Sequence, residues 1–127
     1  MDTKQVDQGA LAAYIECALW SSYGTREEDG STFDLDSYDG DLAPSAHDQM
    51  ASELGDFLAT ERVAKLIEAT GQDLEQAAHD FWLTRNGHGA GFWDRGYGPA
   101  GDELSTLAKA WGSCDLYVGD DGLVYAS

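Results

Sequence analysis

The sequence predicts an α+β fold, in which three or four helices pack on one face of a small antiparallel sheet that ends in a C-terminal hairpin. Apolar residues recur at helical spacing in the first half of the chain, whereas short strand-like runs dominate the second half, with one helical pattern among them. The 127 residues leave room for one hydrophobic core. We therefore expect a single domain over 1–127.

The first helix is expected over 7–22, with Asp7 as its N-cap and Gly24 as its terminator. Trp20 points away from the apolar stripe of this helix, beside Glu16. A neighbouring loop could cover it, or it could be an exposed contact residue, since tryptophan is favoured at interface hot spots. The apolar stripe itself comprises Leu11, Tyr14, Ile15, Ala18 and Leu19.

The segment 25–43 is polar and acidic and shows no regular element of its own. Pro44 opens the next helix, because proline suits a first helical position. Its apolar pattern continues to Gly71 and fits either one bent helix or two. Residues 73–78 add a further helical turn or two.

From His79 onward apolar and other residues alternate, and Asn86-Gly87 is typical of a hairpin turn, so this stretch predicts strands. A short helix is expected over 101–111. Residues 115–125 then predict an antiparallel hairpin in which Tyr117 and Tyr125 pair across the strands.

The charge is strongly uneven. The chain has 24 acidic and 7 basic residues, a net charge of −17, and no lysine or arginine between Arg26 and Arg62. Direct binding to nucleic acid is therefore not expected. No apolar run is long enough to cross a membrane, and the N-terminus lacks a signal-peptide pattern, so we expect a cytoplasmic protein.

The acids concentrate in a region at about 25–58, and we call those within 27–56 the acidic strip. Such a strip could imitate the phosphate backbone of DNA and attract proteins built to hold phosphates, or it could be a solvated face of an acid-rich protein. The candidate partner-binding residues are Trp20 and the strip acids Glu27, Glu28, Asp29, Asp34, Asp36, Asp39, Asp41, Asp48 and Asp56, while Glu53 is the tenth acid of the strip.

Two segments carry a resemblance: 79–96, which reads HDFWLTRNGHGAGFWDRG, and 115–125, which begins DLYVGDDG. In these, and more loosely around Trp20 and in the acidic segment, the chain resembles a family of small, acidic, functionally uncharacterised proteins of bacteriophages and mobile elements. The resemblance implies a phage-type origin, and with it the cytoplasm of an infected bacterium. It supplies no catalytic residue.

The segment 79–96 also contains potential metal ligands, namely His79, Asp80, His88 and Asp94. Their spacing matches no known zinc pattern, so we expect no metal, no cofactor and no enzyme activity. Trp82 and Trp93 are instead expected to be at least half buried.

The function expected from these observations is a DNA mimic. It would inhibit a host DNA-binding protein of the restriction, CRISPR, recombination or uracil-DNA glycosylase type by occupying its nucleic-acid site. The alternatives are a small metal-dependent enzyme that uses the four ligands above, and a generic acidic interaction module.

Overall fold

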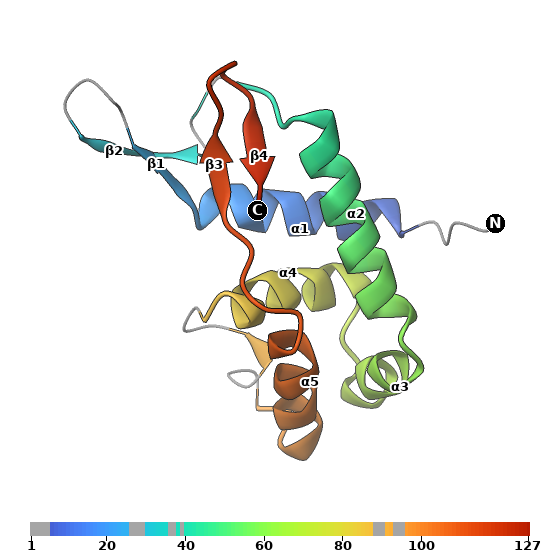
Figure 1. Cartoon of the computed structure of the whole chain (residues 1–127). Helices are drawn as coiled ribbons and strands as arrows, with labels where there is room; N and C mark the ends of the chain where they lie inside the picture. The colour runs from blue at the N-terminus through green and yellow to red at the C-terminus, as the bar shows by residue number, and fades with distance from the viewer. Residues whose placement is uncertain (1–5, 26–29, 36–37, 39, 88–90, 93–95) are drawn as a thin grey trace.

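The computed structural model describes residues 6–25, 30–35, 38, 40–87, 91–92 and 96–127. These residues form five helices and two separate two-stranded antiparallel sheets, which confirms the α+β class (Figure 1). The elements are, in order, α1 (Gln8–Trp20), β1 (Tyr23–Thr25), β2 (Thr32–Asp34), α2 (Pro44–Ala59), α3 (Glu61–Thr70), α4 (Leu74–Arg85), α5 (Pro99–Lys109), β3 (Leu116–Val118) and β4 (Val124–Ala126).

Helix α1 begins as predicted, because the Asp7 carboxylate accepts a hydrogen bond from the Ala10 amide at 2.9 Å. It ends at Ser21, so the prediction that Gly24 terminates it is wrong. Gly24 lies in β1, where a Cβ atom would come within 2.4 Å of the Phe33 ring. The glycine is needed there for close approach of an aromatic ring across the strand pair.

The apolar pattern after Pro44 is two helices. Thr60 has an extended backbone, with φ −63° and ψ 124°, and this break separates α2 from α3. Helix α3 then ends at Gly71, whose φ of 74° lies in the left-handed region that favours glycine.

The prediction of strands after His79 is wrong, because residues 74–85 form the single helix α4. The Asp73 carboxylate caps it by accepting from the Gln76 amide at 2.8 Å. All residues from Asp80 to Arg85 are buried, so this end of the helix shows no polar stripe. The alternation of residue types over 81–85 therefore resembles the pattern of a strand. Asn86 and Gly87 end this helix, and Gly87 has a φ of 74°.

The C-terminal hairpin is confirmed. Tyr117 lies opposite Tyr125, and their rings stack with centroids 5.8 Å apart. A second hairpin, β1–β2, pairs residues 23–25 with residues 32–34. Its first strand ends where the segment 25–43 begins, and its second strand lies inside that segment, in which no regular element was expected. This hairpin projects from the helical body, as Figure 1 shows.

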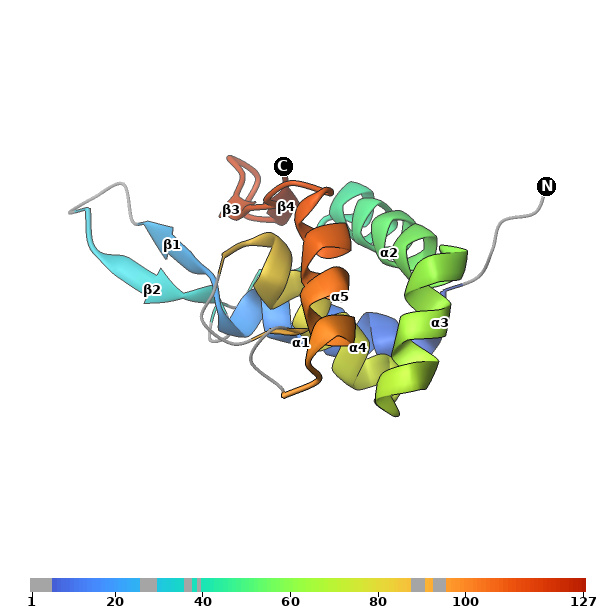
Figure 2. The ribbon, with the colours of Figure 1, turned by 90° about the horizontal axis from the view of Figure 1, so that it is seen from below.

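The core is built around aromatic rings on neighbouring helices. Phe81 of α4 stacks on Tyr14 of α1 at 5.6 Å and on Phe57 of α2 at 4.0 Å. Trp82 is 1 % exposed, as predicted, whereas Trp93 lies outside the described residues. Figure 2 shows α2, α3 and α5 arranged around the α1–α4 pair. Within the described ranges, no helix is both long and apolar enough to span a bilayer.

Candidate functional site

Five acids of the predicted strip lie in the described part of the chain. Four of them are exposed, namely Asp34, Asp41, Asp48 and Asp56, and Glu53 is partly buried. Asp34 ends β2, and Asp41 immediately precedes Leu42, which bridges to Val124 of β4. Asp48 and Asp56 lie two turns apart on α2. The other predicted partner-binding acids lie outside the described residues: Glu27, Glu28, Asp29, Asp36 and Asp39.

Three of these exposed acids lack a basic partner in the described part of the chain. No lysine or arginine there lies within ion-pair distance of Asp41, Asp48 or Asp56. Asp48 lies 3.7 Å from the side chain of the neighbouring His47. The carboxylates of these three acids therefore present their charge to solvent.

Glu53 behaves differently from the other strip acids. Its carboxylate accepts a hydrogen bond from the Arg85 guanidinium at 2.6 Å, and the Arg85 side chain is only 3 % exposed. Arg85 also donates to the Tyr14 hydroxyl and to the main-chain carbonyls of Gly112 and Trp111. Glu53 thus serves the fold, because it neutralises a buried cation.

This ion pair changes the acid–base behaviour of its neighbours. Burial disfavours the charged guanidinium of Arg85, but Tyr14 and Glu53 more than offset that cost, so its pKa is raised. Burial also raises the pKa of Tyr14 strongly, despite Arg85 beside it. Both groups therefore keep their protons across the physiological range.

Three further acids lie beside the strip in the structure, although the sequence did not assign them to this acidic surface. Asp41 accepts at its carbonyl from the Val124 amide at 2.9 Å, which places the C-terminal hairpin beside the strip. The acidic surface of the strip is therefore extended by three exposed acids of the hairpin region, Asp115, Asp120 and Asp121. Only the long-range pairing could have revealed this, since the hairpin follows the strip by about sixty residues or more in sequence.

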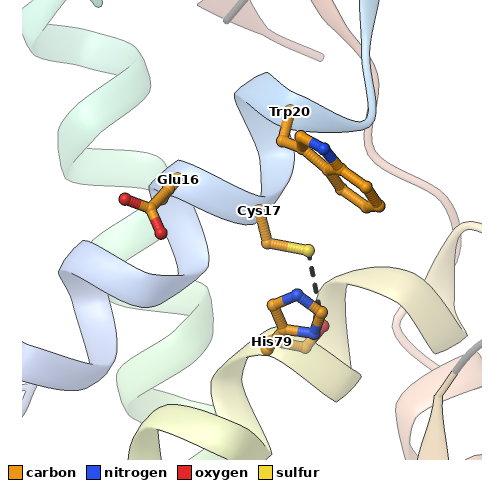
Figure 3. Close-up of a pocket in the computed structure, with 4 residues that line it drawn as sticks. All are labelled: Glu16, Cys17, Trp20 and His79. Atoms are coloured by element: carbon orange, nitrogen blue, oxygen red, sulfur yellow. Dashed lines mark hydrogen bonds between the residues drawn. The ribbon is translucent and has the colours of Figure 1, made fainter.

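Trp20 is 63 % exposed, which decides between the two predicted environments in favour of the exposed one. It lines a pocket between α1 and α4 together with Glu16, Cys17 and His79 (Figure 3).

The residues of the enzyme alternative are only partly described. His79 lies on α4 with a half-exposed side chain, while the adjacent Asp80 is fully buried and accepts from Gln76 Nε2 at 2.9 Å. His88 and Asp94 lie outside the described residues. In the described ranges, no three histidine, cysteine or acidic side chains are grouped so that they could hold a metal ion.

Neither Cys17 nor Cys114 forms a disulfide bond, and both are buried. Burial raises the pKa of the Cys114 thiol, with Glu53 and Asp115 adding to the effect and Arg85 opposing it. A raised pKa reduces the thiolate fraction, which is the reactive form of cysteine.

No protein-family model, curated protein or solved structure matches this chain. The assignment of a function therefore depends on the acidic surface and the pocket themselves.

Proposed function

We propose that this protein is a phage-type DNA mimic that inhibits a DNA-binding protein of a bacterial host, in the host cytoplasm. Its acidic surface occupies the site in which the target normally holds the phosphate backbone. Targets of the restriction, CRISPR, recombination or uracil-DNA glycosylase type all carry such sites. The protein binds its target and catalyses no reaction.

One observation carries the proposal: the described strip acids Asp41, Asp48 and Asp56 are exposed and have no lysine or arginine of the described chain to neutralise them. If selection acted on stability alone, basic residues would be favoured among these acids, because an excess of one charge destabilises the compact state. The two arginines in the described part of the chain pair with other acids, Arg85 with Glu53 and Arg62 with Glu103.

The strip has a rigid part that can hold charges at fixed spacing. The rise of an α-helix places Asp48 and Asp56 about 12 Å apart along α2. The segment that contains Asp41 is tied to β4 by two backbone hydrogen bonds, from the Val124 amide to the Asp41 carbonyl and from the Ala43 amide to the Val124 carbonyl. A preorganised array costs little entropy when a basic partner binds.

The proposal is tested by capture from host lysate with the tagged protein at low and at high salt. We expect a DNA-binding protein to be retained at low salt, released as salt rises, and displaced by duplex DNA, because all three reflect competition for one basic site. A captured protein that has no affinity for DNA, or that duplex DNA fails to displace, would contradict the proposal.

A further inference from the structure

The pocket between α1 and α4 combines an aromatic face with a carboxylate. Its volume is about 370 Å³, and it is lined by Glu16, Cys17, Trp20 and His79. In Figure 3, Glu16 and Trp20 flank Cys17 along α1, and His79 faces them from α4. The floor is held together by a contact from the Cys17 thiol to the His79 carbonyl at 3.8 Å.

The two flanking residues are well suited to a cation. Trp20 is 63 % exposed, and tryptophan is the aromatic side chain that attracts cations most strongly. Glu16 is also exposed, precedes Trp20 by one helical turn and lines the same pocket, with its carboxylate on the other side of Cys17 from the indole ring (Figure 3). An exposed glutamate can change its rotamer to meet a ligand that is held on that ring. Among the described residues, the cation–π contacts of the chain are those of Arg85 with Phe81 and Trp111, and none involves Trp20.

We propose that this pocket binds an arginine side chain of the partner protein, with the guanidinium stacked on Trp20 and hydrogen-bonded to Glu16. A planar guanidinium can stack on an indole ring and donate to a carboxylate at its edge in one geometry, whereas an ammonium acts as a point charge. The choice of a protein arginine rests on the proposed function, because proteins that hold DNA carry arginines. The preference for a guanidinium rests on the pocket alone.

The pocket also argues against an apolar side chain as the occupant. The Glu16 carboxylate and the His79 ring line it. An apolar wedge would bury these polar groups without hydrogen bonds, which is unfavourable. An arginine adds donors to a site that contains acceptors.

Two peptides of equal charge, hexa-arginine and hexa-lysine, separate this pocket from the general attraction of an acidic surface. Affinities are measured by calorimetry, and the Trp20 indole N–H signal is followed by NMR. We expect hexa-arginine to bind more tightly and to shift the Trp20 signal. Trp20→Leu should weaken hexa-arginine binding by roughly threefold to tenfold and remove the preference over hexa-lysine.

Glu16→Gln should reduce the same preference, whereas Glu68→Gln removes an exposed acid of α3 and serves as the matched control. Thermal unfolding of each variant verifies the fold. Equal affinities of the two peptides for the wild type, or an unchanged preference in Trp20→Leu, would overturn the inference. Neither result would affect the proposed DNA mimicry, which is tested with the partner and with the strip acids.

Discussion

Arg85 is the residue on which several elements depend at once. It joins α4 to α1 through Tyr14, to α2 through Glu53, and to the segment after α5 through two carbonyl groups. Its ion-pair partner Glu53 is 32 residues away in sequence, and local spacing cannot show such a contact.

Replacing Arg85 with alanine should lower the free energy of unfolding by about 3–5 kcal/mol, because it leaves Glu53 and several buried acceptors without their donor. Arg62→Ala is the matched control, since it also removes an arginine–glutamate pair but an exposed one. Urea unfolding measures both. Equal losses for the two variants would show that Arg85 has no special structural role.

A second residue-level prediction concerns Asp121 in the C-terminal hairpin. A hydrogen bond from the Tyr125 hydroxyl, at 2.6 Å, is the main cause of its lowered pKa, and the Leu123 amide adds to it. This carboxylate therefore stabilises the fold above its ordinary pKa, and the contribution is lost as pH falls through the lowered value. Tyr125→Phe should raise the Asp121 pKa toward its ordinary value.

The measurement is an NMR titration of the Asp121 carboxyl carbon. Tyr117→Phe is the control, because Tyr117 stacks on Tyr125 but is not among the groups that lower this pKa. A small lowering should survive in Tyr125→Phe, through Leu123. An unchanged Asp121 titration in that variant would show that the hydroxyl contact does not form in solution.

At the level of elements, the sequence predicted those with a distinct local pattern. The first helix has a capping aspartate and an apolar stripe, the next opens on Pro44, and the final hairpin has two strand-forming runs around Gly119–Gly122. Helix α4 was missed from His79 onward, because burial on all sides removed the 3.6-residue period. Hairpin β1–β2 was missed because its strands, Tyr23–Thr25 and Thr32–Asp34, are short and contain glycine and aspartate, which are depleted in strands.

The segment after α4 offers a test of close packing. Gly91 is not among the glycines with positive φ in the described residues, so its backbone conformation alone does not require glycine. A Cβ atom there would instead lie 2.3 Å from Thr84 Oγ1, which accepts a hydrogen bond from the Phe92 amide at 3.1 Å. Gly91→Ala should therefore lower the free energy of unfolding by about 1–3 kcal/mol.

The control for Gly91 is a double-mutant cycle with Thr84→Ala, which removes the obstructing hydroxyl. The double variant should lose less stability than the sum of the two single variants. Simple additivity in urea unfolding would show that the two side chains do not compete for the same space.

The candidate site was predictable only in part. Charge counting located the strip, and the helical wheel placed Trp20 off the apolar stripe, because both depend on local sequence. The structural role of Glu53 and the proximity of the hairpin acids depend on contacts between distant segments. The pocket between α1 and α4 likewise requires His79 to lie on a helix, which the strand prediction excluded.

For the molecule as a whole, the net charge of −17 is the property that the proposed function uses. An exposed ion pair contributes roughly 0–1 kcal/mol, so no single strip acid should dominate binding to the target. Asp36→Asn should change the affinity less than about threefold. A single acid that carried nearly all of the effect would indicate a specific hot spot and not a charge array.

The most direct measurement compares two variants of equal net charge for affinity to the captured host protein. In one, Asp34, Asp36, Asp39 and Asp41 of the strip become asparagine. In the other, four acids outside the strip become their amides, namely Glu61, Glu68, Glu75 and Asp102. Both variants lose the same four charges, but at different places. Because Glu61, Glu75 and Asp102 lie in the first turns of helices, thermal unfolding verifies that the control variant remains folded.

We expect the strip variant to bind at least about tenfold more weakly than the wild type, as four exposed pairs together allow, and to remain folded. The control variant should lose much less affinity and should keep most of the salt dependence. If the strip variant binds as tightly as the wild type, or if the two variants lose affinity equally, the acidic strip does not imitate a phosphate backbone.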